Sequence, residues 1–413
     1  MRNGTSSSAG LPSASLEKTR VLFLHSATRP PLGADTWIHT LIMRHLDRSS
    51  HQVHVACSPG PADAPTPTFA AVRDIPDLQI EPVNLGPELF AKSPSDRARA
   101  ALETAPALWN LLKLARYIKK HRIALVHTSD RPRDAFASVI LARLTGAKCV
   151  VHVHVTYGDW MSPMLRWAMA RADALVGVSE FVARSLVNDG GYPRATTHAV
   201  LNAINLEAWD YHTGPGTIRA ELGVSEDAFV IACVARVFVA KGQAELIRAL
   251  ALVHADVPGA TLLIVGQDYP PGTHYSEELR ALAEELGVAA NVIFTGLRKD
   301  VSRLIAASDV LAMTSYEEPF GLVYAEAMAM KRPVVALDNG GTPEVVEHGK
   351  SGLLSSSGDT AALASNIRKL AGDPELRARM GEYGRKQVEA RFSPQRLARD
   401  VARVYAELLG RAS

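Results

Sequence analysis

The sequence predicts an α/β protein made of two doubly wound parallel-sheet domains, and three observations support this prediction. The chain has 413 residues, too many for one ordinary core and suitable for two domains of about 200 residues each. Ten short apolar runs alternate with amphipathic stretches, as expected for parallel sheets covered on both faces by helices. The alternation is interrupted at 207–223, where a Gly-Pro-Gly sequence is typical of an inter-domain linker.

Each half of the chain supplies five of the apolar runs. Those of the first half cover 21–25, 52–57, 123–127, 149–155 and 174–179. Those of the second half cover 229–236, 261–266, 292–296, 310–315 and 333–338. The helical patterns between them include 36–48, 104–121, 243–255, 276–286 and 360–371. Ligands of such sheets bind beyond the carboxyl ends of the strands, so a cleft between the two domains is the expected site.

The domain boundaries follow from these patterns. We expect a disordered N-terminus over 1–18, which is rich in Ser and Gly, and an N-terminal domain over 19–209. A C-terminal domain is expected over 210–392, followed by a final amphipathic segment over 393–413. Residues 60–102 contain many prolines and few periodic apolar positions, so we expect them to be irregular.

Composition restricts the class of protein and its location. The formal net charge of +2 provides no basic field for nucleic acid. Cys57, Cys149 and Cys233 lie far apart within apolar runs, which predicts buried free thiols in a reducing cytoplasm. The first residues lack the apolar core of a signal peptide, and no apolar run is long enough for a transmembrane helix.

The chain lacks the motifs of several common enzyme classes. It contains no G-x-G-x-x-G, no P-loop, no G-x-S-x-G and no H-E-x-x-H. These absences argue against a simple dinucleotide dehydrogenase, a P-loop nucleotidase, an α/β-hydrolase and a zinc peptidase. The functional residues are therefore expected in segments without these motifs.

Two cations follow an apolar strand in the segment 234–250. Arg236 ends the strand, and Lys241 lies five residues later, just before a helical pattern. Arginine and lysine at a strand's carboxyl end, beside a helix N-terminus, form a plausible diphosphate site. The alternative is a solvated loop with ordinary surface cations.

The segment "SYEEPFGLVYAEAMAM" (315–330) places three acids around a strand-to-helix turn. Pro319 biases Glu318 away from helical geometry and holds it at the lip of the turn. The helix then starts with backbone N–H groups that have no partner within the helix and suit a phosphate. Glu326 follows inside the helix. Two carboxylates on either side of a bound diphosphate suit sugar hydroxyls, because each accepts two hydrogen bonds.

This segment, with "RPVVALDNGGTPEVVEHGKSGLL" (332–354) after it, resembles the donor-binding signature of the family-4 retaining glycosyltransferases. These enzymes have the GT-B architecture of two facing Rossmann-like domains. The family pattern is Glu, seven residues, Glu, which Glu318 and Glu326 fit and Glu317 does not. Segments 30–55, 178–209 and 234–242 also resemble the family, so the likeness covers most of 20–410.

The resemblance implies a role for each matching residue. Glu326 would hold the ribose hydroxyls of a nucleotide sugar, and Glu318 would hold hydroxyls of its hexose. Arg236 and Lys241 would neutralise the diphosphate, with Arg236, Lys241, Glu318 and a histidine acting as the catalytic set. The remaining donor contacts would come from Gly33, Gly296, Arg298, Phe320, Gly321, Leu322, Gly340 and Gly341. By the same resemblance, segment 393–413 would pack back towards the N-terminal domain.

Histidines at strand ends complete the expected site. His152 and His154 share one face of a strand, because side chains alternate with period two. The family often has a histidine at the end of this strand, and His154 is the better match. His152 lies deeper and is interpreted as a core residue. His127 ends another strand and, with Asp130, is expected to shape the acceptor pocket.

The chain departs from the family pattern in three places. Ala235 replaces a glycine before the phosphate arginine, and Ala203 and Asn205 replace residues of a usual Asn-Gly-x-Asp. Lys331 stands where glycine often ends the donor helix, so we expect that helix to end without the usual left-handed glycine cap. None of these changes removes a charged donor ligand.

By this resemblance, the expected function is retaining transfer of a hexosyl group from a UDP- or GDP-sugar to an acceptor hydroxyl. No metal is expected, because two cations and a helix N-terminus can neutralise the diphosphate and no Asp-x-Asp pair is present. The alternatives are a sugar-nucleotide epimerase or hydrolase and a catalytically silent sugar-nucleotide-binding protein. The basic amphipathic stretch 111–122 allows peripheral contact with an anionic membrane, and the alternative there is an ordinary surface helix.

Overall fold

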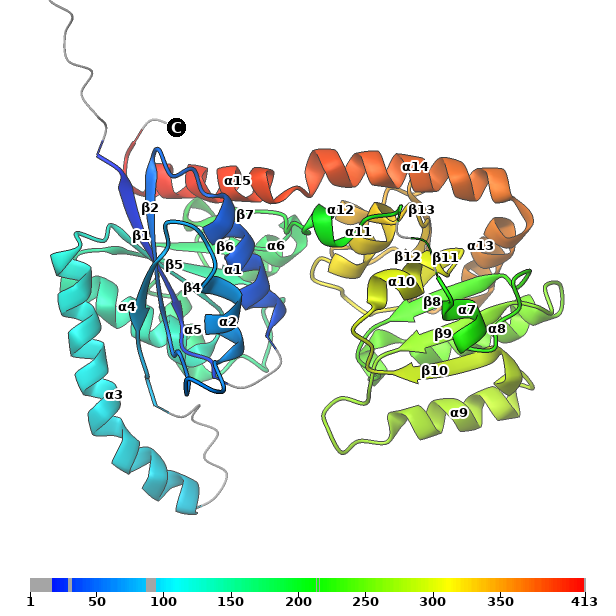
Figure 1. Ribbon diagram of the computed structural model, residues 1–413, viewed down its shortest axis with the longest axis horizontal. Coiled ribbons are helices and arrows are strands. Elements are labelled where there is room, and N and C mark those ends of the chain that lie inside the picture. Colours follow the sequence, from blue (N-terminus) through cyan, green and yellow to red (C-terminus); the bar gives the residue numbers. More distant parts are fainter. Residues whose placement is uncertain (1–16, 29–31, 87–93, 213, 215, 412–413) are drawn as a thin grey trace, which may run out of the picture.

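The computed structural model describes residues 17–28, 32–86, 94–212, 214 and 216–411. It has two lobes, each with one wholly parallel sheet. Figure 1 shows the lobes side by side, with helix α14 over the C-terminal lobe and helix α15 over the N-terminal lobe. The expected disordered segment 1–18 lies almost entirely outside the described residues.

The N-terminal sheet has seven strands in the order β3-β2-β1-β4-β5-β6-β7. Its strands are β1 (Thr19–His25), β2 (His51–Cys57), β3 (Gln79–Pro82), β4 (Leu125–Ser129), β5 (Lys148–Val153), β6 (Ala174–Gly177) and β7 (Thr197–Ala199). The helices of this lobe are α1 (Ala34–His45), α2 (Pro67–Val72), α3 (Pro94–Lys120), α4 (Pro132–Thr145), α5 (Pro163–Met169) and α6 (Glu180–Asn188). The strand order reverses between β1 and β4, and in such sheets ligands bind outside the carboxyl ends of the strands at that point.

The C-terminal sheet has six strands in the order β10-β9-β8-β11-β12-β13. They are β8 (Val230–Val234), β9 (Thr261–Val265), β10 (Val292–Gly296), β11 (Val310–Met313), β12 (Val334–Leu337) and β13 (Gly352–Ser355). The helices are α7 (Ile218–Glu221), α8 (Gln243–His254), α9 (Tyr275–Glu285), α10 (Val301–Ala306), α11 (Leu322–Ala329), α12 (Thr342–Val345), α13 (Thr360–Gly372) and α14 (Pro374–Arg391). Here the order reverses between β8 and β11.

Helix α15 (Pro394–Leu408) returns the chain to the N-terminal lobe. Its apolar residues Leu397, Val401 and Tyr405 belong to the core cluster that also contains strands β1 and β2 and helix α1. The Tyr405 hydroxyl lies 2.6 Å from Nδ1 of His127 on β4. The last helix therefore ties the two lobes together by contributing to the core of the first one.

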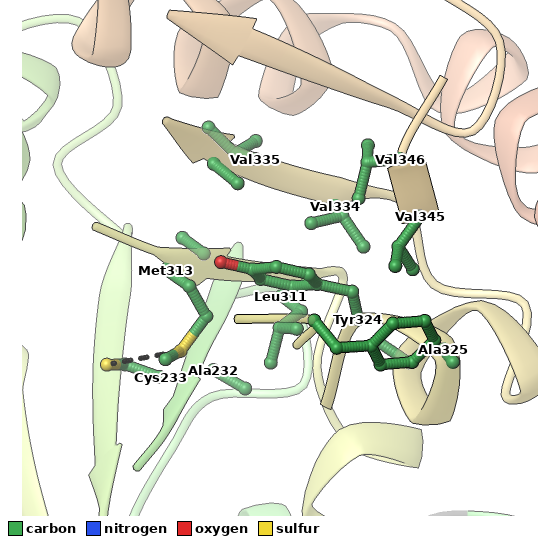
Figure 2. Close-up of a cluster of buried hydrophobic side chains, with 14 of the residues drawn as sticks. Ala232, Cys233, Leu311, Met313, Tyr324, Ala325, Val334, Val335, Val345 and Val346 are labelled. Atoms are coloured by element: carbon green, nitrogen blue, oxygen red, sulfur yellow. Dashed lines mark hydrogen bonds between the residues drawn. The ribbon is translucent and has the colours of Figure 1, made fainter. Parts of the chain in front are cut away.

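The core of the C-terminal lobe holds helix α11 in place. Figure 2 shows Tyr324 of α11 among Leu311, Met313 and Val334 from the adjacent strands β11 and β12. Tyr324 is 1% exposed, and burying an aromatic side chain of this size contributes strongly to core stability. The helix that carries Glu326 is thus anchored directly to the strand that ends before Glu318.

The structure corrects one expectation about local structure and adds detail to another. Residues 60–102 are not simply irregular, because they contain α2, β3 and the start of α3. Lys331 itself takes the left-handed conformation (φ 55°) after α11, so the left-handed position of the usual cap is kept without glycine. Its ammonium pairs with Glu382 at 2.6 Å and lies 3.9 Å from the centre of the Tyr211 ring.

Two further expectations concern the thiols and the membrane. Cys57, Cys149 and Cys233 are buried and free, as expected, and burial raises the pKa of each thiol to about 12. Among the helices of the described residues, none combines the length and apolar character needed to cross a bilayer.

Candidate active site

The turn between β11 and α11 positions the first candidate ligand. Glu318 follows β11 closely, and its carboxylate accepts a 2.6 Å hydrogen bond from the ammonium of Lys241. Lys241 ends the turn after β8, the strand next to β11 in the sheet. The structure therefore brings together two predicted donor ligands that are 77 residues apart in sequence. Glu317 is exposed and has a left-handed backbone (φ 50°).

Gly321 is required at the start of helix α11. Its φ is +86°, a region that residues with a Cβ rarely adopt. A Cβ there would also lie 2.2 Å from the Tyr324 ring, which is fixed in the core. Phe320 is buried and packs edge-on against Phe392, with ring centroids 5.6 Å apart. Leu322 packs against the core clusters of both lobes, so the start of α11 lies where the lobes meet.

Glu326 is the most distinctive group in this part of the protein. Its carboxylate has no hydrogen-bond or ion-pair partner among the residues that the structure describes. Loss of solvation raises the pKa of this carboxyl group from 4.5 to about 7. A carboxylate that is shielded from water and has no hydrogen-bond partner costs free energy. A ligand that donates hydrogen bonds to it, as ribose hydroxyls can, removes this cost.

Two adjacent glycines support the turn that carries Glu318. A Cβ on Gly340 would lie 2.7 Å from the carbonyl oxygen of Glu318, and one on Gly341 would lie 2.4 Å from that of Pro319. The N–H of Gly341 donates a 2.7 Å hydrogen bond to the Glu318 carbonyl. The predicted donor glycines thus lie directly against the turn and fix its backbone.

The loop after β8 presents its two cations in different ways. Arg236 is exposed, and its guanidinium lies 4.1 Å from the centre of the Tyr269 ring, an orientation stabilised by cation–π attraction. Gly242, after Lys241, has φ +69°, and a Cβ there would lie 2.1 Å from the carbonyl oxygen of Thr314. Sequence reasoning missed Gly242, although its position between Lys241 and a helix start was a usable signal.

Gly296 and Arg298 lie at the edge of the C-terminal sheet. Gly296 ends β10 with φ +68°, and its carbonyl accepts a hydrogen bond from the N–H of Gly266. The guanidinium of Arg298 forms two hydrogen bonds with Asp300, at 2.8 and 2.7 Å. A ligand contact through Arg298 would therefore compete with this pair.

The two lobes contact one another beside the β11–α11 turn. The Ser179 hydroxyl, which follows β6, donates a hydrogen bond to the carbonyl of Pro319. The Glu344 carboxylate of α12 accepts hydrogen bonds of 2.8 and 2.7 Å from the N–H groups of Glu180 and Phe181, at the start of α6. The carboxyl ends of strands β6 and β11, from different lobes, thus lie close together.

The N-terminal lobe contributes a buried polar cluster at the ends of its central strands. The N–H of His154 donates a 3.0 Å hydrogen bond to Asp130. Burial raises the pKa of the Asp130 carboxyl group, although His154 opposes the shift. Burial also lowers the pKa of the His154 imidazole, so this side chain is neutral at pH 7. The predicted catalytic histidine and Asp130 are therefore neighbours.

Gly33, the residue before helix α1, lies next to this cluster. A Cβ on Gly33 would come within 2.1 Å of the Asp35 carboxylate and 2.6 Å of the Arg131 guanidinium. Arg131 donates hydrogen bonds of 2.7 and 3.1 Å to Asp35. The glycine thus leaves room for an ion pair at the end of the sheet, which sequence reasoning did not find because its members are 96 residues apart.

His127 and His152 are fully buried. Nδ1 of His127 lies against the Tyr405 hydroxyl, and its ring stacks on Phe23 with centroids 4.9 Å apart. His152 contacts His39 of helix α1 through a 3.2 Å separation between ring nitrogens. His127 has no exposed surface, so any effect on an acceptor would pass through its neighbours. Its role in acceptor binding stays a prediction.

Comparison with known proteins decides the family. The model described as Glycosyltransferase Family 4 matches residues 33–208, and the model described as Glycosyl transferases group 1 matches residues 216–387. A GDP-mannose-dependent alpha-(1-6)-phosphatidylinositol monomannoside mannosyltransferase of Mycolicibacterium smegmatis is 34% identical over 66% of this chain and 74% of its own length. The chain belongs to glycosyltransferase family 4. One family model therefore matches each lobe of the transferase, and the linker lies between the two matched ranges.

Other similarities extend over nearly the whole transferase. The N-acetyl-alpha-D-glucosaminyl L-malate synthase of Bacillus anthracis is 25% identical over 92% of this chain and 95% of its own length. With some other curated relatives, such as a D-inositol 3-phosphate glycosyltransferase of Corynebacterium jeikeium, the chain spans only about half of their length (46%). A crystal structure of Anabaena Alr3699/HepE in complex with UDP and glucose superposes with a TM-score of 0.75, covering 94% of this chain and 100% of that one at 24% identity. This likeness confirms the GT-B fold.

Proposed function

We propose that the transferase moves a hexosyl group from a nucleotide-diphosphate sugar to an acceptor hydroxyl, with retention of anomeric configuration, in glycan, glycolipid or glycoside biosynthesis. The observation that carries this proposal is the Glu326 carboxylate, which has no partner among the described residues and lies in α11, the helix that begins just after the Lys241–Glu318 pair. Ribose hydroxyls would donate hydrogen bonds to Glu326. The hexose hydroxyls would bind Glu318 and the diphosphate would bind Lys241, which would separate these two side chains. Such an arrangement fits a donor that has a sugar at each end of a diphosphate.

The chemistry of the proposed step is dominated by the departing diphosphate. As the bond to the anomeric carbon breaks, negative charge grows on the leaving oxygen. Lys241, Arg236 and the N-terminus of α11 would stabilise that charge. The acceptor oxygen would form the new bond on the same face, with its proton passing to a phosphate oxygen. Glu318, released from Lys241, would orient the hexose, and His154 would position the sugar beside its developing positive charge.

The donor class has two candidates. The related mannosyltransferase of Mycolicibacterium smegmatis is named as GDP-mannose-dependent, and the structure of Alr3699/HepE contains UDP and glucose. Both relatives support a UDP- or GDP-sugar as the donor. We further propose that the reaction needs no metal ion at the diphosphate, because the cations of this chain would do that work.

A panel of nucleotide sugars tests the proposal. The full chain is incubated with each donor, with and without candidate acceptors, in buffer containing a chelator, and released nucleotide is measured. Release that depends on an acceptor supports transfer. Release without acceptor supports the alternative of a hydrolase, and an altered donor without release supports an epimerase. Binding of a donor without turnover of any donor in the panel would support the alternative of a catalytically silent sugar-nucleotide-binding protein.

The surface of helix α3 supports a second proposal, that the transferase contacts an anionic membrane from the cytoplasm. Leu108, Trp109 and Leu112 are exposed large apolar residues on this helix. The cations of Lys113 and Arg116 both lie 5.7 Å from the centre of the Trp109 ring. Apolar and basic residues on one helix suit the boundary of an anionic bilayer. Sedimentation with anionic and neutral vesicles, comparing wild type with Trp109→Ser, tests this contact.

A further inference from the structure

Five histidines meet at the carboxyl end of the N-terminal sheet. His25 ends β1, His127 belongs to β4, His152 belongs to β5, His154 follows β5, and His39 comes from helix α1. Four of them are completely buried, and His154 is half-buried. The proposed transfer reaction uses only His154, so the donor site does not explain why the other four histidines lie beside it.

Three of these rings are arranged like ligands. One ring nitrogen from each of His39, His152 and His154 lies within 4.8 Å of the other two. Nε2 of His39 is 3.2 Å from Nδ1 of His152. Two nitrogens bound to a tetrahedral zinc ion at its usual bond length are roughly 3.3 Å apart, so this pair already has the spacing of two ligands. His152 and His154 lie two residues apart on one strand face and present their rings together.

The same rings have unused binding capacity. Among the described residues, Nε2 of His154 is buried without a hydrogen-bond partner. Nε2 of His152 is also unpartnered, but it is the ring nitrogen that does not face His39. A neutral imidazole ring keeps a lone pair on one nitrogen, which can bind an ion. Buried polar nitrogens are normally paired, and a bound ion would satisfy Nε2 of His154.

The surroundings of the three rings suit a divalent ion. Nδ1 of His39 lies 2.8 Å from Nε2 of His25, so His25 can hold the His39 ring with its other nitrogen facing the cluster. Histidines that bind metals usually have their second nitrogen held by a carboxylate, a backbone carbonyl or water, and here His25 takes that place. Asp35 and Asp130 both interact electrostatically with His154 and supply negative charge, which Arg131 offsets in part.

We propose that His39, His152 and His154 form a binding site for a transition-metal ion of the Zn²⁺ class, joining helix α1 to strand β5. Imidazole nitrogens favour Zn²⁺, Ni²⁺, Co²⁺ and Cu²⁺ over the hard ions Mg²⁺ and Ca²⁺. The ion and the donor hexose would compete for His154, the side chain that the proposed transfer uses, so metal binding is measured in the absence of donor. The proposal does not depend on the identity of the donor.

Metal titration of the full chain, prepared without a histidine tag and treated with chelator, tests this site. We expect one Zn²⁺ per chain by calorimetry, one Co²⁺ with the visible absorption of a low-symmetry site, and no comparable Mg²⁺ binding. Zn²⁺ should also raise the Tm of the wild type by several degrees, because an ion that binds only the folded state stabilises it.

Matched variants locate the ion. His152→Gln and His154→Gln should each weaken Zn²⁺ binding by about 100-fold and remove the rise in Tm. His274→Gln is the control, because that side chain is 75% exposed and lies outside the cluster. If His152→Gln does not fold, the His154→Gln variant decides the test, because His154 is only half-buried. Absence of stoichiometric binding in the wild type, or unchanged binding in a folded His154→Gln, would show a hydrogen-bonded histidine network only and overturn the proposal.

Discussion

Lowering the pH from 8 to 6 should weaken nucleotide-sugar binding by about tenfold, because Glu326 becomes protonated. Its pKa in the ligand-free protein is about 7, so about nine tenths of the carboxyl groups are ionised at pH 8 and about one tenth at pH 6. Ribose hydroxyls donate hydrogen bonds, which are stronger to a carboxylate than to a neutral carboxylic acid. The donor thus binds the ionised form preferentially, and affinity falls as that form is lost.

Titration calorimetry across this pH range provides the measurement. A nucleotide sugar is the right ligand, because its diphosphate is esterified at both ends and does not titrate near neutral pH. Glu326→Gln should bind more weakly at pH 8 and show little change with pH. Glu317→Gln, which alters an exposed acid nine residues earlier, should retain the wild-type dependence. A flat profile in the wild type, or an unchanged slope in Glu326→Gln, would refute this reasoning.

Four further predictions use the same part of the protein. The Glu326 carboxyl group has a pKa of 4.5 in the unfolded chain and about 7 in the folded protein, so it destabilises the fold increasingly as the pH rises through this range. Glu326→Gln should therefore raise the free energy of unfolding by up to about 3 kcal/mol at pH 8, seen as a higher Tm, and leave it unchanged at pH 4. Lys241→Ala should lower kcat by about 100-fold in a donor-turnover assay, with a smaller change in donor affinity, because it removes a cation that stabilises the leaving group. Glu318→Gln should cost far more activity than Glu317→Gln, since only Glu318 pairs with Lys241; equal losses would contradict the assignment. Gly321→Ala should destabilise the protein by at least about 2 kcal/mol in chemical denaturation, from a left-handed backbone and the clash with Tyr324.

Sequence patterns predicted the main strands but not the short ones at the sheet edges. Each of the ten apolar runs overlaps a strand of the structure. The strands that were missed are β3, β7 and β13, which have only four, three and four residues. All three lie at the edge of a sheet and pair with one neighbour only. A short edge strand needs no long apolar run, so its sequence carries little signal.

The turn between β11 and α11 was predictable because its residues are close in sequence. Pro319, Gly321 and the spacing of Glu318 and Glu326 are local features, and each has a local physical meaning. The Lys241–Glu318 pair was only implied, because 77 residues separate its members. The left-handed backbone of Lys331 was not expected. Its cost in free energy is offset by contacts of the side chain with Glu382 and Tyr211, and only the fold brings these residues together.

The sequence by itself therefore determined the two α/β domains and the resemblance to the family, and it predicted the acids and cations of the donor site. Only the tertiary structure decided which groups meet across the chain, such as the histidine cluster and the Asp35–Arg131 pair. It also leaves Glu326 without a partner among the residues it describes, and burial raises the pKa of this carboxyl group. The physical reason is that apolar periodicity and turn chemistry act over a few residues, whereas burial and charge interactions depend on strands brought together from distant segments.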